Sequence, residues 1–262
     1  TTTTDETTTS SSGSGVFVGV GASGNIVKST DNGSTWDNAT TDNSTANHLR
    51  GVTFGNNTFV AVGNSGNIVR STDNGSSWDN ATSPIGTYLY GNSFGNNSFV
   101  AVGSGGKILR STDNGSSWDN ATSCHFSTNL YGITFGNNTF VGVGDSGKIV
   151  RSTDNGSSFE NVTSNTSNLL YGVTFGNNTF VAVGTDGNIV RSTDNGSSWD
   201  NATSPIGTYL YGNTFGNNTF VGVGSGGKIV RSTDNGTNWD NSTSPTGNGL
   251  YGVTFGNNTF VA

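Results

Sequence analysis

A block of about 40 residues repeats along the chain, and this repeat limits the folds that the chain can adopt. The run 71–78 (STDNGSSW) recurs with its aspartate at steps of 42, 40, 41, 40 and 40 residues. A second run, 51–60 (GVTFGNNTFV), also occurs six times in full or near-full form. Periods of this length are typical of solenoids and propellers, so we expect an array of similar units.

One repeat divides into four short predicted strands with no helical period. The strands predicted within 89–122 are 89–94, 98–102, 107–112 and 116–120. Turns rich in Gly and Asn separate them, and the Asn114-Gly115 pair favours the positive φ angles of a two-residue hairpin loop. Four strands per repeat of this length indicate a propeller blade.

These units predict an all-β fold, a six-bladed β-propeller of four-stranded antiparallel blades. The repeats begin with a second strand at 16–20 and reach a first strand at 250–255. Pairing of these two strands would close the ring and remove exposed sheet edges. We therefore divide the chain into a propeller over 16–262 and a Thr/Ser-rich flexible tether over 1–15.

The repeated run resembles a known motif. It is similar to the Asp-box, or BNR, motif of sialidases, sortilin-type receptors and related propellers, and 59–75 is similar to the repeats of photosystem II stability/assembly factor-like proteins. The resemblance covers 16–262 and implies that each aspartate binds its own turn while an aromatic ring packs between blades. These positions are Asp31, Asp73, Asp113, Asp154, Asp194 and Asp234, with Trp36, Trp78, Trp118, Phe159, Trp199 and Trp239.

Most of the charged residues belong to the repeat. If Asn74-Gly75 form a two-residue loop, Arg70 faces Asp79 across the hairpin, and such a pair contributes about 0.2–1 kcal/mol. The same rule pairs Lys28 with Asp37, Arg110 with Asp119, Arg151 with Glu160, Arg191 with Asp200 and Arg231 with Asp240. These pairs and the six turn aspartates account for 18 of the 27 charged residues.

This charge assignment disfavours catalysis. The sialidase resemblance would require an arginine cluster, a Tyr/Glu nucleophile pair and an acid/base aspartate, yet every arginine except Arg50 belongs to the repeat. A glycosidase needs two carboxyls about 5–9.5 Å apart, whereas Asp145 and Asp186 occupy equivalent turns of adjacent blades. Cys124 is the single cysteine and there are two histidines, so we expect no metal site, no cofactor and no enzyme.

Two partner classes are also excluded by composition. The net charge is −7 with ten basic residues, which argues against nucleic-acid binding by phosphate neutralisation. No apolar run approaches the roughly 20 residues of a membrane helix, so we expect no direct membrane insertion.

Differences among the six copies locate a candidate binding face. The Gly-Asn-Asn turns and the aspartate turns hardly vary, but the turns between second and third strands and the connections between blades do. In an up-and-down blade these two variable sets lie on one face, and loops on a rigid scaffold commonly carry binding, although neutral drift would give the same pattern. The candidate contacts are His48, Arg50, Tyr88, His125, Phe126, Asp145, Asp186 and Tyr209.

Asn-x-Ser/Thr triplets are frequent and are N-glycan acceptors in a secreted protein. Turn chemistry explains the same residues without any glycan. The acceptors predicted are Asn56, Asn96, Asn137, Asn177, Asn217 and Asn257 in the first turn, and Asn38, Asn80, Asn120, Asn161, Asn201 and Asn241 after the fourth strand.

Together these features predict a non-enzymatic, glycosylated recognition, adhesion or coat module, extracellular or at the cell surface. It would bind a surface glycan or protein through the variable loops, with avidity, as part of a larger surface protein or assembly. One alternative, implied by the resemblance, is an assembly-factor-like scaffold that docks a partner protein complex. A second, disfavoured alternative is a sialidase-like hydrolase.

Overall fold

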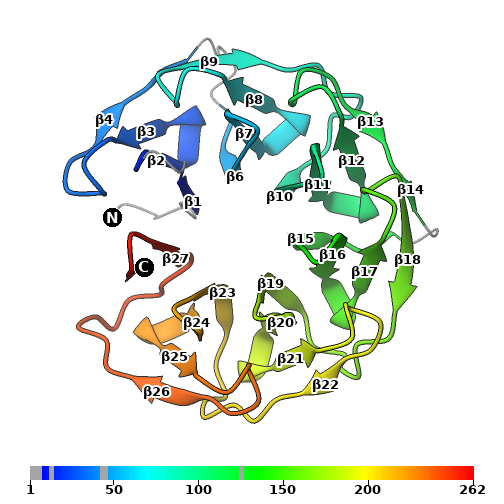
Figure 1. Cartoon of the computed structure of the whole chain (residues 1–262), viewed down its shortest axis with the longest axis vertical. Coiled ribbons are helices and arrows are strands. Elements are labelled where there is room, and N and C mark those ends of the chain that lie inside the picture. Colours follow the sequence, from blue (N-terminus) through cyan, green and yellow to red (C-terminus); the bar gives the residue numbers. More distant parts are fainter. Residues whose placement is uncertain (1–7, 12–14, 42–46, 124–126) are drawn as a thin grey trace.

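The computed structural model describes residues 8–11, 15–41, 47–123 and 127–262. In these residues the chain forms sheets arranged around a common centre, like the blades of a propeller (Figure 1). Six sheets have the up-and-down antiparallel order of a blade, and two of them carry an additional outer strand. The predicted all-β propeller of four-stranded blades is confirmed to this extent.

The four strands of each blade run in order from the centre outward. The inner strands are β1 (Thr8–Ser11), β6 (Leu49–Gly55), β10 (Leu89–Gly95), β15 (Leu130–Gly136), β19 (Leu170–Gly176) and β23 (Leu210–Gly216). The second strands are β2 (Phe17–Val20), β7 (Thr58–Gly63), β11 (Ser98–Gly103), β16 (Thr139–Gly144), β20 (Thr179–Gly184) and β24 (Thr219–Gly224). The third strands are β3 (Ile26–Ser29), β8 (Ile68–Ser71), β12 (Ile108–Ser111), β17 (Ile149–Ser152), β21 (Ile189–Ser192) and β25 (Ile229–Ser232). The outer strands are β4 (Asp37–Asn38), β9 (Ser77–Asn80), β13 (Asp119–Asn120), β18 (Ser158–Val162), β22 (Asp200–Asn201) and β26 (Asp240–Ser242).

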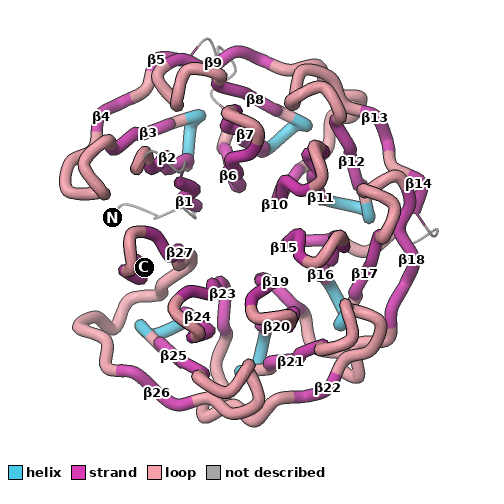
Figure 2. Tube along the Cα trace, viewed as in Figure 1, coloured by secondary structure: helices cyan, strands magenta, loops and turns pink. Residues whose placement is uncertain are grey.

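Single 3-10 turns join the second and third strands (Figure 2). They are η1 (Ala22–Gly24), η2 (Asn64–Gly66), η3 (Ser104–Gly106), η4 (Asp145–Gly147), η5 (Thr185–Gly187) and η6 (Ser225–Gly227). No helix among the described residues has the length and apolar character needed to cross a membrane.

The closure predicted between the two terminal strands is not present in the described pairings. β2 pairs with β1, so part of the segment expected to be tether is the inner strand of the first blade. β27 (Thr254–Gly256) pairs instead with β28 (Thr259–Val261), because positive φ angles at Asn257 and Asn258 fold the chain back at once. This two-stranded hairpin lies between the sixth blade and the first (Figure 1).

Short outer strands connect neighbouring blades in a way that the repeat did not predict. β5 (Thr40–Thr41) leaves the first blade and pairs in parallel with β9 of the second. β14 (Thr122–Ser123) does the same with β18 of the fourth blade. The chain leaving one blade therefore adds a strand to the next before it turns inward.

The predicted hairpin register is confirmed in all six blades. Arg70 faces Asp79 across β8 and β9, and the five equivalent pairs have the same register. Among the described residues, the ion pair within 4.0 Å is that of Arg151 with Glu160, at 2.8 Å. Lys28, Arg110 and Arg191 instead donate to the next blade, as where Arg110 Nε donates to Asn155 O at 2.7 Å.

Each aspartate turn is a closed set of hydrogen bonds, and Asp194 shows the pattern. Its carboxylate accepts bonds from the Ser198 hydroxyl (2.6 Å), the Ser198 amide (2.9 Å) and the Ser192 hydroxyl (2.8 Å). The bond from the Ser198 hydroxyl is the largest influence and outweighs burial, and the pKa of Asp194 is lowered from an ordinary 3.8 to about 2. The pKa values of Asp31, Asp73, Asp113 and Asp234 are also lowered to about 2.

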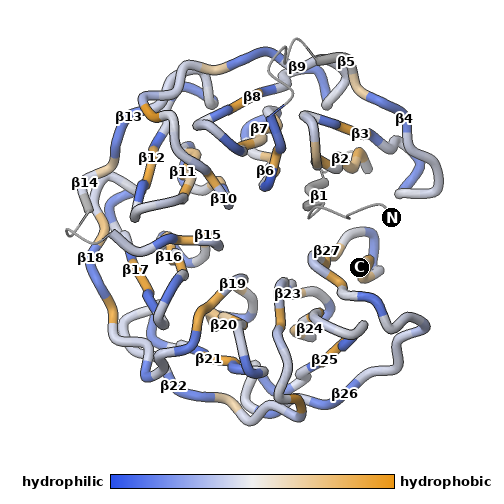
Figure 3. Tube along the Cα trace, turned by 180° about the vertical axis from the view of Figure 1, so that it is seen from behind, coloured by the Kyte–Doolittle hydropathy of each residue, from blue (hydrophilic) through white to orange (hydrophobic). Residues whose placement is uncertain are grey.

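The core lies between successive blades. Trp78 is buried with Val16 and Val18 of the first blade and Phe59 of its own, and the aromatic residues of the later turns are buried in the same way. Apolar residues accordingly lie along the second and third strands, with hydrophilic residues outside (Figure 3). Trp36 of the first blade is 40 % exposed. The unit that precedes this blade around the ring is the two-stranded hairpin β27–β28 and not a complete four-stranded blade.

A glycine at the end of the inner strands β6, β10, β15, β19 and β23 receives a phenylalanine ring of the unit that follows. A Cβ atom at Gly95 would overlap the ring of Phe135, and the equivalent glycines face Phe94, Phe175, Phe215 and Phe255 in the same way. The phenylalanine also packs on its own second strand, with ring centroids 4.7 Å apart for Phe135 and Phe140. Neighbouring blades are therefore held at one spacing by a ring that fits over a glycine.

We predict that Gly95→Ala destabilises the protein by about 1–3 kcal/mol, because the methyl group overpacks this contact. Gly86 is the matched control, since a Cβ atom there meets nothing within 4 Å. Urea unfolding followed by tryptophan fluorescence measures both variants. Equal stability of Gly95→Ala and Gly86→Ala would contradict the proposed spacing contact.

We predict that stability is nearly constant above pH 4 and declines as the pH falls from 3.8 toward 2. The folded-state pKa of the turn aspartates is depressed, so the unfolded chain takes up protons first and the stabilisation disappears through this window. Urea midpoints measured between pH 2 and 6 test this. Asp194→Asn should lower stability at pH 6 by about 1–2 kcal/mol and flatten the pH dependence; an unchanged slope would refute the assignment.

Candidate functional site

The variable loops gather on one face of the ring, as the sequence predicts. In the second blade, the backbone N–H of Asn64 in η2 donates a hydrogen bond to the carbonyl of His48, the residue that precedes β6. A Cβ atom at Gly66 of the same turn would overlap the carbonyl of Ile85, in the connection to the third blade. We call this side the variable face. The 3-10 turns, the inter-blade connections and the starts of the inner strands form it.

The opposite side, the uniform face, is tied together by asparagines. Asn56 Nδ2 donates to Asn114 Oδ1 of the next blade at 2.7 Å, and Asn177 bonds Asn235 in the same way at 2.6 Å. All twelve predicted glycan acceptors are exposed, six of them on these turns. Attachment of glycans stays a prediction.

A β-bulge near the start of the inner strands β6, β10, β15, β19 and β23 aims one side chain toward the centre. In β10, Leu89 pairs with Gly103 and Gly91 with Val102, which leaves Tyr90 as the extra residue. Leu89 stays fully buried while Tyr90 turns to the centre, the usual effect of a bulge. The residues at this position are Arg50, Tyr90, Tyr131, Tyr171 and Tyr211, and Tyr251 holds the equivalent position before β27.

The glycine after each of these residues lets neighbouring inner strands touch. A Cβ atom at Gly91 would lie 2.7 Å from the carbonyl oxygen of Tyr131, and one at Gly132 would lie 2.7 Å from that of Tyr171. Any larger residue would separate the strands. The tyrosines on adjacent strands are therefore held within ring-to-ring contact.

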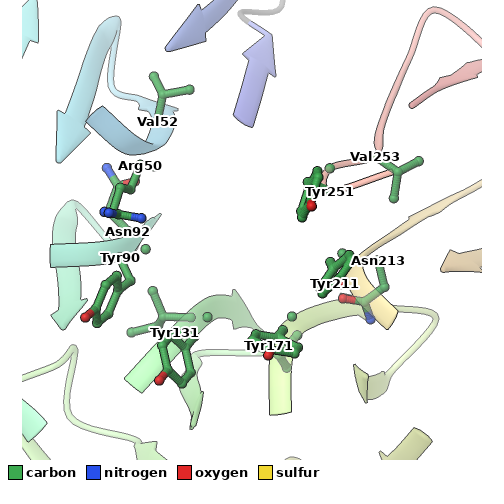
Figure 4. Close-up of a pocket in the computed structure, with 18 residues that line it drawn as sticks. Arg50, Val52, Tyr90, Asn92, Tyr131, Tyr171, Tyr211, Asn213, Tyr251 and Val253 are labelled. Carbon is green, nitrogen blue, oxygen red and sulfur yellow. The ribbon is translucent and has the colours of Figure 1, made fainter. Parts of the chain in front are cut away.

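The tyrosines form a continuous row around the mouth of a central cavity (Figure 4). Ring centroids of Tyr90, Tyr131, Tyr171, Tyr211 and Tyr251 follow one another at 5.1, 5.7, 5.5 and 4.7 Å. We call this row the tyrosine arc. The cavity has a volume of about 380 Å³, and the second layer of its wall consists of Val52, Asn92, Ile133, Val173, Asn213 and Val253.

Arg50 begins the arc in place of a tyrosine. Its Nε donates to Asn64 Oδ1 at 2.6 Å, and its guanidinium carbon lies 5.6 Å from the ring centroid of Tyr90 and 5.8 Å from that of Tyr88. These are cation–π distances. Arg50 is the one charged residue among those that line the described cavity.

Tyr131 has an acidic neighbour on the variable face. The Asp145 carboxylate accepts a hydrogen bond from the backbone N–H of Asn129 at 3.1 Å. The side-chain Nδ2 of Asn129 donates to the Tyr131 hydroxyl oxygen at 3.3 Å. Burial raises the pKa of Tyr131; the Asn129 bond opposes this and Asp145 adds to it.

The predicted contact residues fall into three groups: those beside the tyrosine arc, those elsewhere on the variable face, and those outside the described residues. Arg50 and Tyr88 meet in one corner, Tyr209 contacts Tyr211 with centroids 6.2 Å apart, and Asp145 lies beside Tyr131. His48 contributes a backbone carbonyl, while Asp186 is exposed at a φ of 56° in η5. His125 and Phe126 lie outside the described residues.

The arc tyrosines themselves were missed by the sequence analysis. They occupy one position of the Leu-Tyr-Gly run in five copies, whereas the sequence analysis sought contact residues where the copies differ. The replacement of this tyrosine by Arg50 in one copy was the signal in the sequence that could have pointed to the position. In the described part of the chain, no group of three His, Cys, Asp or Glu side chains could hold a metal ion.

Comparisons with known proteins identify the fold. No protein-family model and no curated protein matches the sequence. The chain is similar to a structure of YCF48 bound to a D1 peptide (TM-score 0.77, 19 % identity, 96 % of this chain and 86 % of that chain). It is also similar to YCF48 from Cyanidioschyzon merolae (0.73, 17 %, 98 % and 92 %) and to the WD40 β-propeller domain of Doa1 (0.73, 14 %, 96 % and 86 %).

We predict that Tyr131 ionises above its ordinary pKa of 10.0, because burial and the nearby Asp145 carboxylate disfavour the phenolate. Difference titration at 295 nm between the wild type and Tyr131→Phe isolates this group. Asp145→Asn should move the pKa back toward the ordinary value. No change on Asp145→Asn would show that the carboxylate does not act on the ring.

Proposed function

We propose that this protein is a non-enzymatic docking module of the assembly-factor type, which binds a segment of a partner protein along the tyrosine arc. The observation that carries this proposal is the row of adjacent tyrosines at the mouth of the central cavity. The proposal takes the assembly-factor alternative of the sequence analysis in preference to extracellular adhesion.

The chemistry of the arc favours a peptide segment. Tyrosines supply large contact area with a hydroxyl at the edge and are enriched at protein interfaces and among their strongest contacts. Cavities of about 300–1,000 Å³ accommodate small ligands, so this one admits a few side chains rather than a folded domain. The lining contains no carboxylate among the described residues, which leaves glycoside hydrolysis without its acid pair.

The comparison with YCF48 supports the same interpretation. One of the similar propellers is described as bound to a D1 peptide. A ring of this fold therefore provides a frame on which a peptide can dock. At 19 % identity the partner of that protein is not transferred to this one.

The location of the protein and its glycans remain predictions from the sequence. The exposed Asn56-type turns are the sites at which glycopeptide mapping of the natively produced protein would find sugars. Glycans there would be compatible with docking on the variable face, because the turns are on the opposite side of the ring.

We predict that Tyr171→Ala weakens the binding of docked peptides at least tenfold, because Tyr171 lies in the middle of the arc and removal of its ring interrupts the row. Peptides selected from a displayed library against the wild type would be measured by calorimetry. Thr72→Ala, an exposed position on the uniform face, is the control and should bind normally. Failure to select any peptide, or equal binding by Tyr171→Ala, would refute the proposed function.

A further inference from the structure

The tyrosine arc contains two corners of the same construction. Tyr88 and Tyr90 make one, with ring centroids 6.3 Å apart at an interplanar angle of 69°. Tyr209 and Tyr211 make the other, at 6.2 Å and 78°. Both tyrosine pairs belong to the duplicated run that spans 81–90 and 202–211, so their backbone and loop surroundings match. The outer tyrosine of each corner is well exposed, 47 % for Tyr88 and 44 % for Tyr209.

The two corners differ in the residue contributed by the preceding blade. Arg50 stands beside Tyr88 and Tyr90, whereas Tyr171 occupies the equivalent position and meets Tyr211 edge to face, with ring centroids 5.5 Å apart. The supporting 3-10 turn differs as well. Asn64 holds Arg50 through a bond of 2.6 Å, and Thr185 stands at the equivalent position of η5. Arg50 and Asn64 thus replace Tyr171 and Thr185 together.

Charges of the described residues are divided between the two faces. Six aspartate turns place their carboxylates on the uniform face. On the variable face, four cations accompany two carboxylates: Arg50, Lys107, Lys148 and Lys228 with Asp145 and Asp186. Among the described residues, cations therefore outnumber carboxylates on the variable face of a protein whose net charge is −7. A ligand group that enters the cavity mouth meets Arg50 as the charged group of the lining.

We propose that the corner of Arg50, Tyr88 and Tyr90 is a carboxylate subsite of the peptide-docking arc. A guanidinium binds a carboxylate in its own plane through paired N–H bonds, and it can do so while its flat faces rest on aromatic rings. Asn64 and the two tyrosines hold Arg50 in such an orientation. The two rings also exclude water from one side of the ion pair, which strengthens it.

The subsite gives the docked segment a direction. Its carboxylate, from an acidic side chain or a chain terminus, lies at β6 and β10. Its uncharged side chains extend along Tyr131 and Tyr171 to the second corner, where Tyr171 replaces the cation. This inference rests on the proposed function and specifies which segments the arc accepts.

Two exchanges between the corners provide the test. Arg50→Tyr gives the first corner the residue found in the second, and the combination of Tyr171→Arg with Thr185→Asn does the reverse. Each exchange introduces residues that the equivalent corner already accommodates. Thermal unfolding checks that both variants fold, and Arg50→Lys tests whether charge suffices without the planar fork.

The probe is a displayed library of random dodecapeptides with free carboxyl termini, selected in parallel on the wild type and the variants. We expect wild-type peptides to share a carboxylate and to lose at least tenfold in affinity on Arg50→Tyr. Amidated and Asp-to-Asn versions of each peptide then tell a terminal carboxylate from a side-chain one. The reverse exchange should select peptides with two acidic groups.

The outcomes separate the two proposals. Peptides that bind the arc with no preference for an acidic group, or that bind Arg50→Tyr as tightly as the wild type, would overturn the carboxylate subsite and leave the docking function standing. Absence of any selected peptide on the wild type would overturn both.

Discussion

Contact between neighbouring inner strands through glycine is the constraint on which the rest of this molecule depends. Gly91 and Gly132 let the backbone of one blade touch the carbonyl of the next, and the glycines that close the inner strands receive a phenylalanine ring. From the second blade to the hairpin β27–β28, each unit meets the next at the same two points, so their spacing around the centre is fixed. The buried aromatic residues of the aspartate turns, such as Trp118, then fill the outer part of the interfaces.

The same contacts create the candidate site. A bulge turns one residue of each inner strand from β6 onward to the centre, and the glycine beside it brings the next such residue into contact. The tyrosine arc is thus a direct product of blade packing and needs no dedicated loop. Residues of the variable face make the arc irregular. They are Arg50 with Asn64, the exposed rings of Tyr88 and Tyr209, and Asp145 beside Tyr131. Asymmetry in an otherwise regular ring is what allows a ligand to be recognised in one orientation.

The sequence predicts the blades well, because turn chemistry and cross-strand register are local. Asn74-Gly75 fixes the pairing of Arg70 with Asp79, and the structure has that register in every copy. Three features depend on contacts between units and were not predictable in this way. They are the strand pairing of β1 with β2, the parallel addition of β5 to β9, and the aim of Tyr90 at its bulge. Strand propensity does not show a bulge, and a position that is the same in most copies gives no sign that it faces a ligand. Arg50 was identified because it departs from the repeat.

The most direct test of the account is where a bound peptide perturbs the ring. Protein labelled with ¹³C at tyrosine and tryptophan would be titrated with a peptide selected on the wild type and followed by NMR. The account predicts shifts at Tyr90, Tyr131, Tyr171 and Tyr211, with the buried Trp78 and Trp199 unchanged. Shifts confined to the tryptophans, with the arc tyrosines unmoved, would place binding elsewhere on the ring and contradict the central role given to the arc.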